Sequence, residues 1–223
     1  MKVKIPKSIT VNLAEETGWH IGDGSMNFYK NQGKLKGTYQ LRGHIEDDRD
    51  HYLSRIKPLF KEIYGCDLSL RAMPSTRVFG FQIWNDELVN FKHKIGLPLG
   101  KKTDVFIPSI FLESNQLKKA VIRGIFDTDG GIYLEKKNKK LYPRMEIRTI
   151  SLKLAEQLVQ TFGELGLRAT MYSELFNSEF NRQRTHVISI RGEEMFHLFI
   201  KEIQPENKKH LLKYASFLNS KSF

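Results

Sequence analysis

The sequence contains a single cysteine, Cys66, and has no apolar run long enough to cross a membrane as a helix. One cysteine excludes a disulfide within the chain and a zinc site built from several thiolates. The start of the chain, residues 1–6, alternates lysines with apolar residues and lacks the apolar core of a secretory signal. These absences predict a protein of the cytoplasm or nucleoid with no membrane partner.

Acidic residues are also in deficit. The 223 residues include 36 Lys and Arg but only 25 Asp and Glu, which gives a net charge of +11. The excess is divided almost equally between the two halves of the chain, so it does not form a basic tail. This distribution suits a broad face that binds a polyanion such as a nucleic acid, the alternative being a merely basic protein.

The chain contains an internal repeat. Residues 13–24 and residues 119–130 both place small residues at every fourth position and both end in an acidic turn. One constant shift along the sequence relates the helix-interface pairs Ala14 and Ala120 and Gly18 and Gly124. The same shift relates Gly22 to Thr128 and Asp23 to Asp129. A shift that is longer by one residue relates Lys101-Lys102 to Lys208-Lys209. Small residues at this spacing form one stripe on a helix, through which two helices approach closely. We therefore predict that the two helices pack together and that the carboxylates at their ends bind a cation.

Hydrophobic periodicity predicts the same order of elements, αββαββα, in each unit. We assign the first unit to residues 1–102, a linker to residues 103–114 and the second unit to residues 115–223. The Gly- and Lys-rich segments 30–36 and 136–140 are predicted to be hairpin turns. Alternation in the strands leaves one sheet face polar and basic. We expect an α+β fold whose two antiparallel sheets form a DNA-binding saddle.

Three aromatic residues, Trp19, Trp84 and Phe126, are interpreted as core residues rather than as base-stacking residues. His20, within the first helix, is expected to be buried and hydrogen-bonded rather than a metal ligand. Asp127 is interpreted as a structural cap, with a catalytic role as the alternative.

The segments 16–24 and 122–130 resemble the paired signature of LAGLIDADG homing endonucleases. The second segment matches more closely, whereas the first departs at Glu16 and His20, where the family pattern is apolar. The first segment nevertheless keeps the central glycine and the terminal Gly-Asp-Gly. An EF-hand is excluded because the later loop positions lack the ligands that it needs. The resemblance covers nearly the whole chain.

The resemblance implies a divalent-metal-dependent endonuclease that cuts double-stranded DNA at a long asymmetric site. Asp23 and Asp129 are the implied catalytic residues and metal ligands, and the carbonyl groups of Gly22 and Thr128 are further implied ligands. We expect Mg²⁺ as the cofactor, with Mn²⁺ able to replace it and Ca²⁺ binding without supporting cleavage. Because both halves lie on one chain, we expect a monomer.

Family members also place polar or basic side chains around the metals, with ordinary DNA contact as the alternative role. The candidates for this place are Arg42, Arg148, His44 and Gln82. The candidates for DNA binding are Lys30, Lys34, Lys36, Gln40, Arg77, Lys136, Lys137, Lys139, Lys140, Arg144, Arg182 and Arg184.

The sequence lacks the splicing residues of an intein at both of its ends, so we expect a free-standing, intron-encoded enzyme. Two alternatives stay open. The first is an RNA maturase that binds intron RNA and assists splicing. The second is a catalytically inactive DNA-binding regulator of the same fold, although the presence of both acids argues against it.

Overall fold

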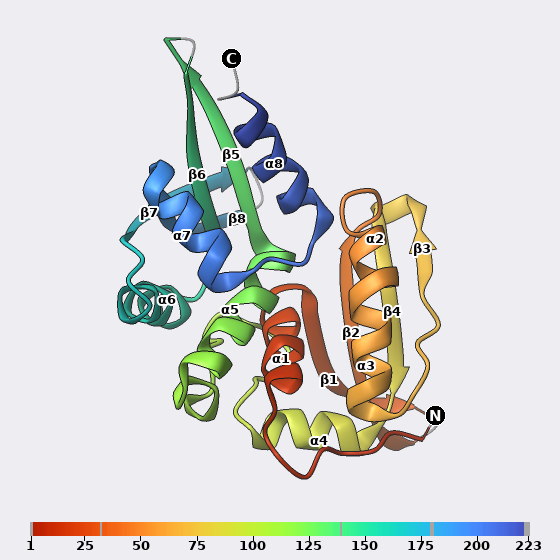
Figure 1. The fold of residues 1–223 in the computed structure, drawn as a ribbon. Helices are drawn as coiled ribbons and strands as arrows, with labels where there is room; N and C mark the ends of the chain where they lie inside the picture. The colour runs from red at the N-terminus through yellow and green to blue at the C-terminus, as the bar shows by residue number, and fades with distance from the viewer. Residues whose placement is uncertain (1, 32, 139, 179–180, 221–223) are drawn as a thin grey trace.

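The computed structural model describes residues 2–31, 33–138, 140–178 and 181–220, which form two units side by side (Figure 1). The first unit comprises α1 (Val11–Asp23), β1 (Gly24–Asn31), β2 (Lys34–His44), α2 (Arg49–His51), a π-helical turn (Tyr52–Ile56), α3 (Lys57–Tyr64), β3 (Arg71–Met73), β4 (Val78–Trp84) and α4 (Asp86–Lys94). The second comprises α5 (Asn115–Asp129), β5 (Gly130–Lys137), β6 (Lys140–Thr149), α6 (Leu152–Glu164), β7 (Ala169–Ser178), β8 (Asn181–Arg191), α7 (Glu193–Ile203) and α8 (Lys208–Asn219).

Each unit contains one four-stranded antiparallel sheet. The strand orders, β1-β2-β4-β3 and β5-β6-β8-β7, are equivalent in the two units. The α+β fold with two antiparallel sheets, expected from the sequence, is therefore confirmed. The unit boundaries and the linker at residues 103–114 stay predictions. In the described part of the chain, no helix combines the length and the apolar character needed to span a membrane.

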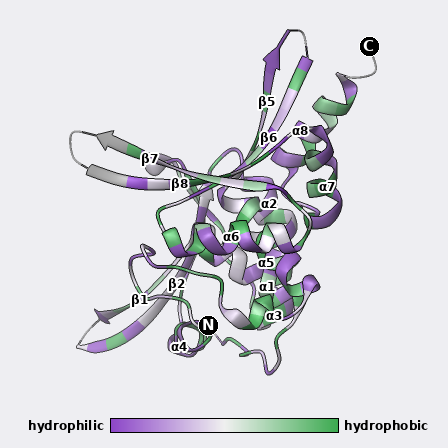
Figure 2. Ribbon diagram, turned by 90° about the vertical axis from the view of Figure 1, so that its left-hand side faces the viewer, coloured by the Kyte–Doolittle hydropathy of each residue, from purple (hydrophilic) through white to green (hydrophobic). Residues whose placement is uncertain are grey.

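The hairpins are longer than the sequence predicts. β1 and β2 pair as far as Asn31 and Lys34, and β5 and β6 pair as far as Lys137 and Lys140, so most of each expected turn is strand. The polar residues at the ends of these hairpins show no alternation of polar and apolar side chains. Their backbones nevertheless continue the antiparallel pairing of the two strands. Figure 2 shows the hairpins projecting beyond the helices.

Capping residues mark the start of the two central helices, and a change to extended backbone conformation marks their end. The side chains of Thr10 and Ser114 accept hydrogen bonds from backbone amides of the first turns of α1 and α5. At the other ends, Gly24 and Gly130 adopt extended conformations and begin β1 and β5 at once. Each acid of the repeat is therefore the last residue of its helix and lies where the helix meets its sheet.

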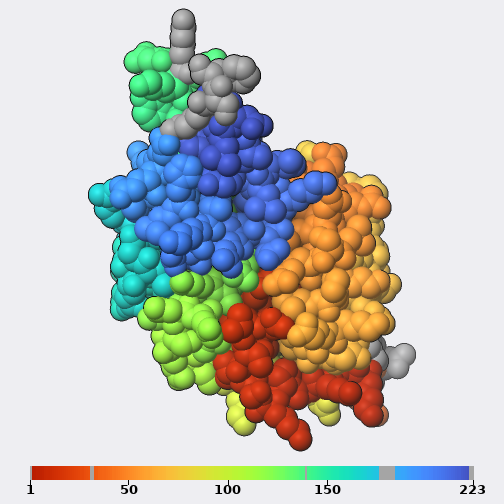
Figure 3. Space-filling model, viewed as in Figure 1, coloured from red at the N-terminus to blue at the C-terminus, as the bar shows by residue number. Residues whose placement is uncertain are grey.

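The packing of α1 on α5 is the most extensive helix–helix contact in the described structure. A Cβ atom on Gly18 would lie 2.8 Å from the Cα atom of Gly124, and a Cβ atom on Gly124 would lie 2.9 Å from the Cα atom of Gly18. Only glycine allows backbones to approach this closely. The buried carboxylate of Glu15 adds ion pairs to Arg55 (2.7 Å) and across the helix pair to Arg123 (3.2 Å). Figure 3 shows the two units in continuous contact.

Glu16 departs from an apolar pattern because it belongs to a buried polar cluster. Its carboxylate accepts hydrogen bonds from the Lys92 ammonium and from the hydroxyl groups of Tyr39 and Tyr64, and all four side chains are buried. A buried carboxylate is tolerated when it is paired and hydrogen-bonded in this way.

Two of the three aromatic residues lie in the core as expected, since Trp19 and Phe126 are fully buried. Trp84 is not a core residue, because it is 46% exposed and lies on the polar face of its sheet beside Gln82. His20 is buried and stacks on Tyr39, with 5.1 Å between ring centroids. The expected hydrogen bond is not found, because neither ring nitrogen of His20 has a partner among the described residues.

Gly18→Ala should lower the free energy of unfolding by about 1–3 kcal/mol, because the new methyl group would overlap the backbone of α5. Gly163→Ala is the matched control, since its Cβ would meet no atom within 4 Å and α6 would gain a better helix former. We expect this control to raise stability by about 0.4–1 kcal/mol. Urea denaturation measures both, and equal effects would contradict the proposed close contact.

Candidate active site

The two acidic helix ends lie beside each other. A Cβ atom on Gly22 would lie 3.3 Å from the carboxylate carbon of Asp129 and 2.8 Å from the Cβ atom of Thr128. On the other side, a Cβ atom on Gly43 of β2 would lie 2.7 Å from Oδ2 of Asp23. Each carboxylate therefore lies against a glycine, in space that a side chain would fill.

The carboxyl group of Asp23 is poorly ionised in this setting. Burial raises its pKa to about 8, and the charges of Asp129 and Asp48 add to the increase. The Tyr52 hydroxyl, which donates a 3.0 Å hydrogen bond to Asp23, and the Lys209 ammonium act in the opposite direction. A cation bound here would favour the ionised form.

Asp129 opens onto a cavity of about 190 Å³ that Lys102 and Arg148 also line. Asp129 is exposed to solvent on this side of the protein. Partial desolvation by the surrounding protein and the charge of Asp48 raise the pKa of Asp129, whereas the charges of Lys102 and Lys209 lower it.

Lys102 and Lys209 are site residues that the sequence analysis did not assign. The Lys102 ammonium donates to the carbonyl oxygens of Ile21, at 2.9 Å, and of Gly22. The Lys209 ammonium lies 3.5 Å from the carbonyl oxygen of Thr128. The signal was present, because the two lysines recur at nearly the same distance from their acids in both units.

Asp48 lies near both acids, since its charge raises the pKa of Asp23 and that of Asp129. Its Oδ1 accepts hydrogen bonds from Lys209 (2.8 Å) and from Asn207 (2.9 Å), and its Oδ2 accepts one from the backbone amide of His44 (2.8 Å). The carboxylate of Asp127 accepts hydrogen bonds from the amides of residues 206 and 207. Asp127 therefore occupies the structural position expected for it and holds the start of α8.

Of the remaining pocket candidates, Arg148 lines the cavity of Asp129, whereas Arg42 and His44 have other described partners. Arg148 is paired with Glu146 and Glu174. Arg42 is exposed and donates a 3.5 Å hydrogen bond to Gln82. His44 instead pairs with Asp47 at 3.2 Å.

The DNA-binding candidates are mainly exposed and follow the hairpins. Those exposed are Lys30, Lys34, Lys36, Arg77, Lys136, Lys137, Lys140 and Arg184, whereas Gln40 and Arg144 are half-buried on the sheet faces. Lys139 and the side chain of Arg182 lie outside the described residues.

The donor atoms at the helix ends fit a hard divalent cation. Asp23 and Asp129 offer carboxylate oxygens, and Gly22 and Thr128 offer the carbonyl oxygens that the two lysines contact. Oxygen ligands suit Mg²⁺, Mn²⁺ and Ca²⁺. Among the described residues, no three acidic, His or Cys side chains form a closed metal cage. A metal here would keep ligand positions for water and substrate.

Comparison with known proteins identifies the fold. Residues 116–204 match the LAGLIDADG-like domain family. The whole structure resembles a variant of the homing endonuclease I-DmoI with a TM-score of 0.63 and 16% identity, covering 86% of this chain and 90% of that one. The chain has the LAGLIDADG fold. The resemblance drawn from the two acidic segments is thereby confirmed.

Other structures with this LAGLIDADG fold are complexes. I-DmoI with DNA and Mn gives a TM-score of 0.61 at 17% identity, covering 86% of this chain and 96% of that one. The LAGLIDADG meganuclease I-AabMI, bound to uncleaved DNA, gives a TM-score of 0.56 at 13% identity, covering 96% and 93%.

A curated relative places a similar sequence within a longer protein. The chain is 27% identical over 219 residues to the glutamine–fructose-6-phosphate aminotransferase of Methanocaldococcus jannaschii. The match covers 97% of this chain but 18% of that protein's length. The chain therefore corresponds to a minor part of that longer protein.

Asp23→Asn should stabilise the metal-free protein at pH 8. The folded protein retains a proton on Asp23 that the unfolded chain releases, so this residue lowers stability as pH rises from about 4 to about 8. Urea denaturation in EDTA should give the variant a higher free energy of unfolding than the wild type at pH 8. This difference should shrink toward pH 5. Asp104→Asn, at an exposed carboxylate, should change little. A pH-independent difference would contradict the assigned shift.

Proposed function

We propose that this chain is a site-specific, metal-dependent endonuclease that cuts double-stranded DNA. The observation that carries the proposal is the meeting of Asp23 and Asp129 at the ends of two packed helices, with Lys102 and Lys209 beside them. The basic charge and the exposed lysines of the hairpins support a duplex as the partner. Relatives of the same fold bound to DNA support it further.

Each group near the acids has a definable role in phosphodiester hydrolysis. Mg²⁺ would be held by Asp23, by Asp129 and by the carbonyl groups of Gly22 and Thr128. We expect Mn²⁺ to replace it and Ca²⁺ to bind without supporting cleavage. When bound, the metal supplies a Lewis acid to the phosphate. Lys102 and Lys209 hold positive charge where negative charge develops on the phosphate.

The proposal also covers the setting in which the enzyme works. A monomer in the cytoplasm or nucleoid reads an asymmetric site, because the two units differ in sequence and lie on one chain. An intron-encoded gene is one origin. The match within a longer protein favours a second origin, in which the enzyme is carried inside a host protein.

Asp23→Asn and Asp129→Asn should each abolish cleavage of at least one strand while DNA binding persists, because an amide cannot neutralise a metal ion. Strand-resolved nicking of a bound duplex with Mg²⁺ measures this, with Asp104→Asn as the control. Wild-type rates in either variant would contradict the assignment. A wild-type protein that binds but does not cut would be a regulator, and one that instead promotes splicing of a precursor RNA would be a maturase.

Lys102→Met and Lys209→Met should each slow single-turnover cleavage by about a hundredfold with little change in affinity, because their ammonium groups lie at the helix ends. Lys101→Met and Lys208→Met are matched controls at exposed neighbouring positions. These controls should weaken binding and lower its salt dependence while the rate is retained. If the control variants changed the cleavage rate and the affinity as much as Lys102→Met and Lys209→Met do, the role assigned to Lys102 and Lys209 would be wrong.

A further inference from the structure

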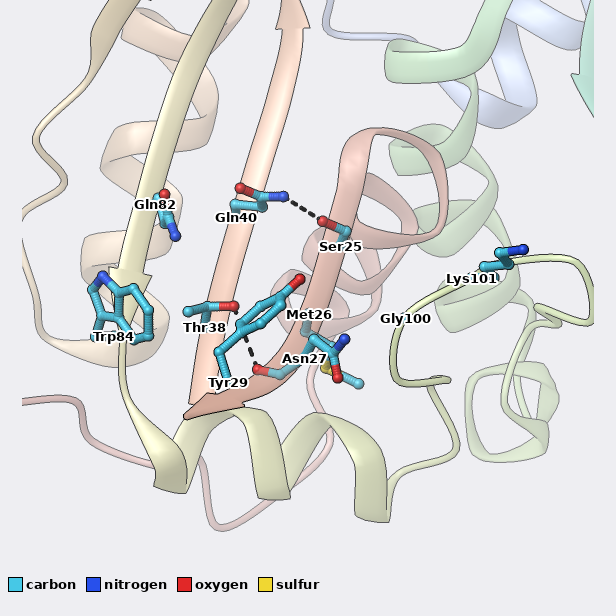
Figure 4. A pocket seen from close by; sticks show the side chains of 10 residues that line it. All are labelled: Ser25, Met26, Asn27, Tyr29, Thr38, Gln40, Gln82, Trp84, Gly100 and Lys101. Carbon is cyan, nitrogen blue, oxygen red and sulfur yellow. Dashed lines mark hydrogen bonds between the residues drawn. The ribbon is translucent and has the colours of Figure 1, made fainter. Parts of the chain in front are cut away.

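Several neutral polar side chains lie together on the polar face of the first sheet, beside Arg42. Ser25, Gln40 and Gln82 contribute to a cavity of about 460 Å³ on this face (Figure 4). Gln40 lies opposite Gln82 in the pairing of β2 with β4, and its amide donates a 2.6 Å hydrogen bond to Ser25. Amides such as these pair with the edge of adenine in the major groove.

The equivalent position in the second sheet carries a charge. The shift that relates the two units takes Gln40 to Glu146, a residue that is 2% exposed although it lies on the polar face of β6. Its carboxylate forms ion pairs with Arg144 (3.0 Å) and Arg148 (3.2 Å) and accepts a 3.4 Å hydrogen bond from Tyr172. Burial of this charge is tolerable because the two arginines compensate it.

The two arginines are held differently. Arg148 also pairs with Glu174 at 2.8 Å, so its guanidinium group forms ion pairs with the carboxylates of both Glu146 and Glu174. Arg148 lies beside the cavity of Asp129. Arg144 contacts Glu146 through Nε, and its guanidinium carbon lies 5.3 Å from the centre of the Tyr133 ring. The contact to Glu146 does not use the terminal nitrogens of Arg144, whose side chain is 32% exposed.

The ion pair at Nε and the Tyr133 ring restrict where the planar guanidinium group of Arg144 lies, although its Nε–H has no hydrogen-bond partner among the described residues. A guanidinium fork matches the O6 and N7 acceptors of guanine, and fixing it in advance reduces the entropy lost on binding. A phosphate contact needs no such orientation.

We propose that Glu146 is a positioning residue that orients Arg144 to read a guanine in the half-site bound by the second sheet. This inference rests on the proposed function, because it requires that the sheets bind a DNA duplex. The first sheet has Gln40 where the second has Glu146, so the two half-sites are read by different chemistry. Specificity then resides in a carboxylate that does not itself contact a base.

Selection from a randomised duplex library, with Ca²⁺ in place of Mg²⁺, tests the proposal. The wild-type protein should recover a motif with a strongly preferred guanine in one half-site. Arg144→Ala and Arg144→Lys should each reduce this preference by about tenfold or more, although lysine keeps the charge. Glu146→Gln should relax the same position while the rest of the motif is retained.

Gln40→Ala is the matched control, because it occupies the equivalent position and should alter only the opposite half-site. Far-UV circular dichroism and thermal melting establish that each variant is folded, and the Arg144→Lys result stands independently if Glu146→Gln does not fold. Uniform weakening on all sequences by Arg144→Ala would overturn the proposal in favour of a phosphate contact. An unchanged motif with Glu146→Gln would overturn the positioning role. A wild-type protein that binds no duplex would instead refute the proposed function.

Discussion

The close approach of α1 and α5 is the constraint on which the rest of the structure depends. Gly18 and Gly124 let the two backbones touch, and each helix ends at an acid where its sheet begins. The distance between the helices therefore sets the distance between the carboxylates. It also fixes how the two sheets lie relative to each other, since β1 and β5 leave the helix ends directly.

Bringing the acids together has an electrostatic cost that the surrounding residues reduce. Burial and neighbouring acids raise the pKa of Asp23, while Lys209 acts against that increase. Lys102 has the same effect on Asp129. The Glu15–Arg123 ion pair joins α1 to α5, and the buried Glu16 cluster holds α1 against its own unit. Sites that serve a function commonly carry an unfavourable contribution to stability of this kind.

Much of this arrangement is predictable from local pattern. The stripe of small residues, the repeated order of elements and the paired acids predicted the helix contact and the α+β fold, because each depends on spacing along the chain. The position of Trp84 was predictable too, since strict alternation with Phe81 and Ile83 puts it on the polar face.

Other features depend on contacts between distant segments, which a single sequence does not fix. The hairpin lengths follow from cross-strand pairing, and the role of Lys102 follows from the turn of the chain back to the end of α1. Glu146 looks like a solvated charge on a strand, and only its neighbours across the sheet show it to be buried.

Under the proposed function, the two helix ends form one metal-dependent centre. Anomalous diffraction from crystals of the protein bound to a selected duplex in Mn²⁺ tests it most directly. The account predicts anomalous peaks bonded to carboxylate oxygens of both Asp23 and Asp129, next to a phosphate of each strand. Peaks elsewhere, or none at these two residues in a well-ordered complex, would contradict it.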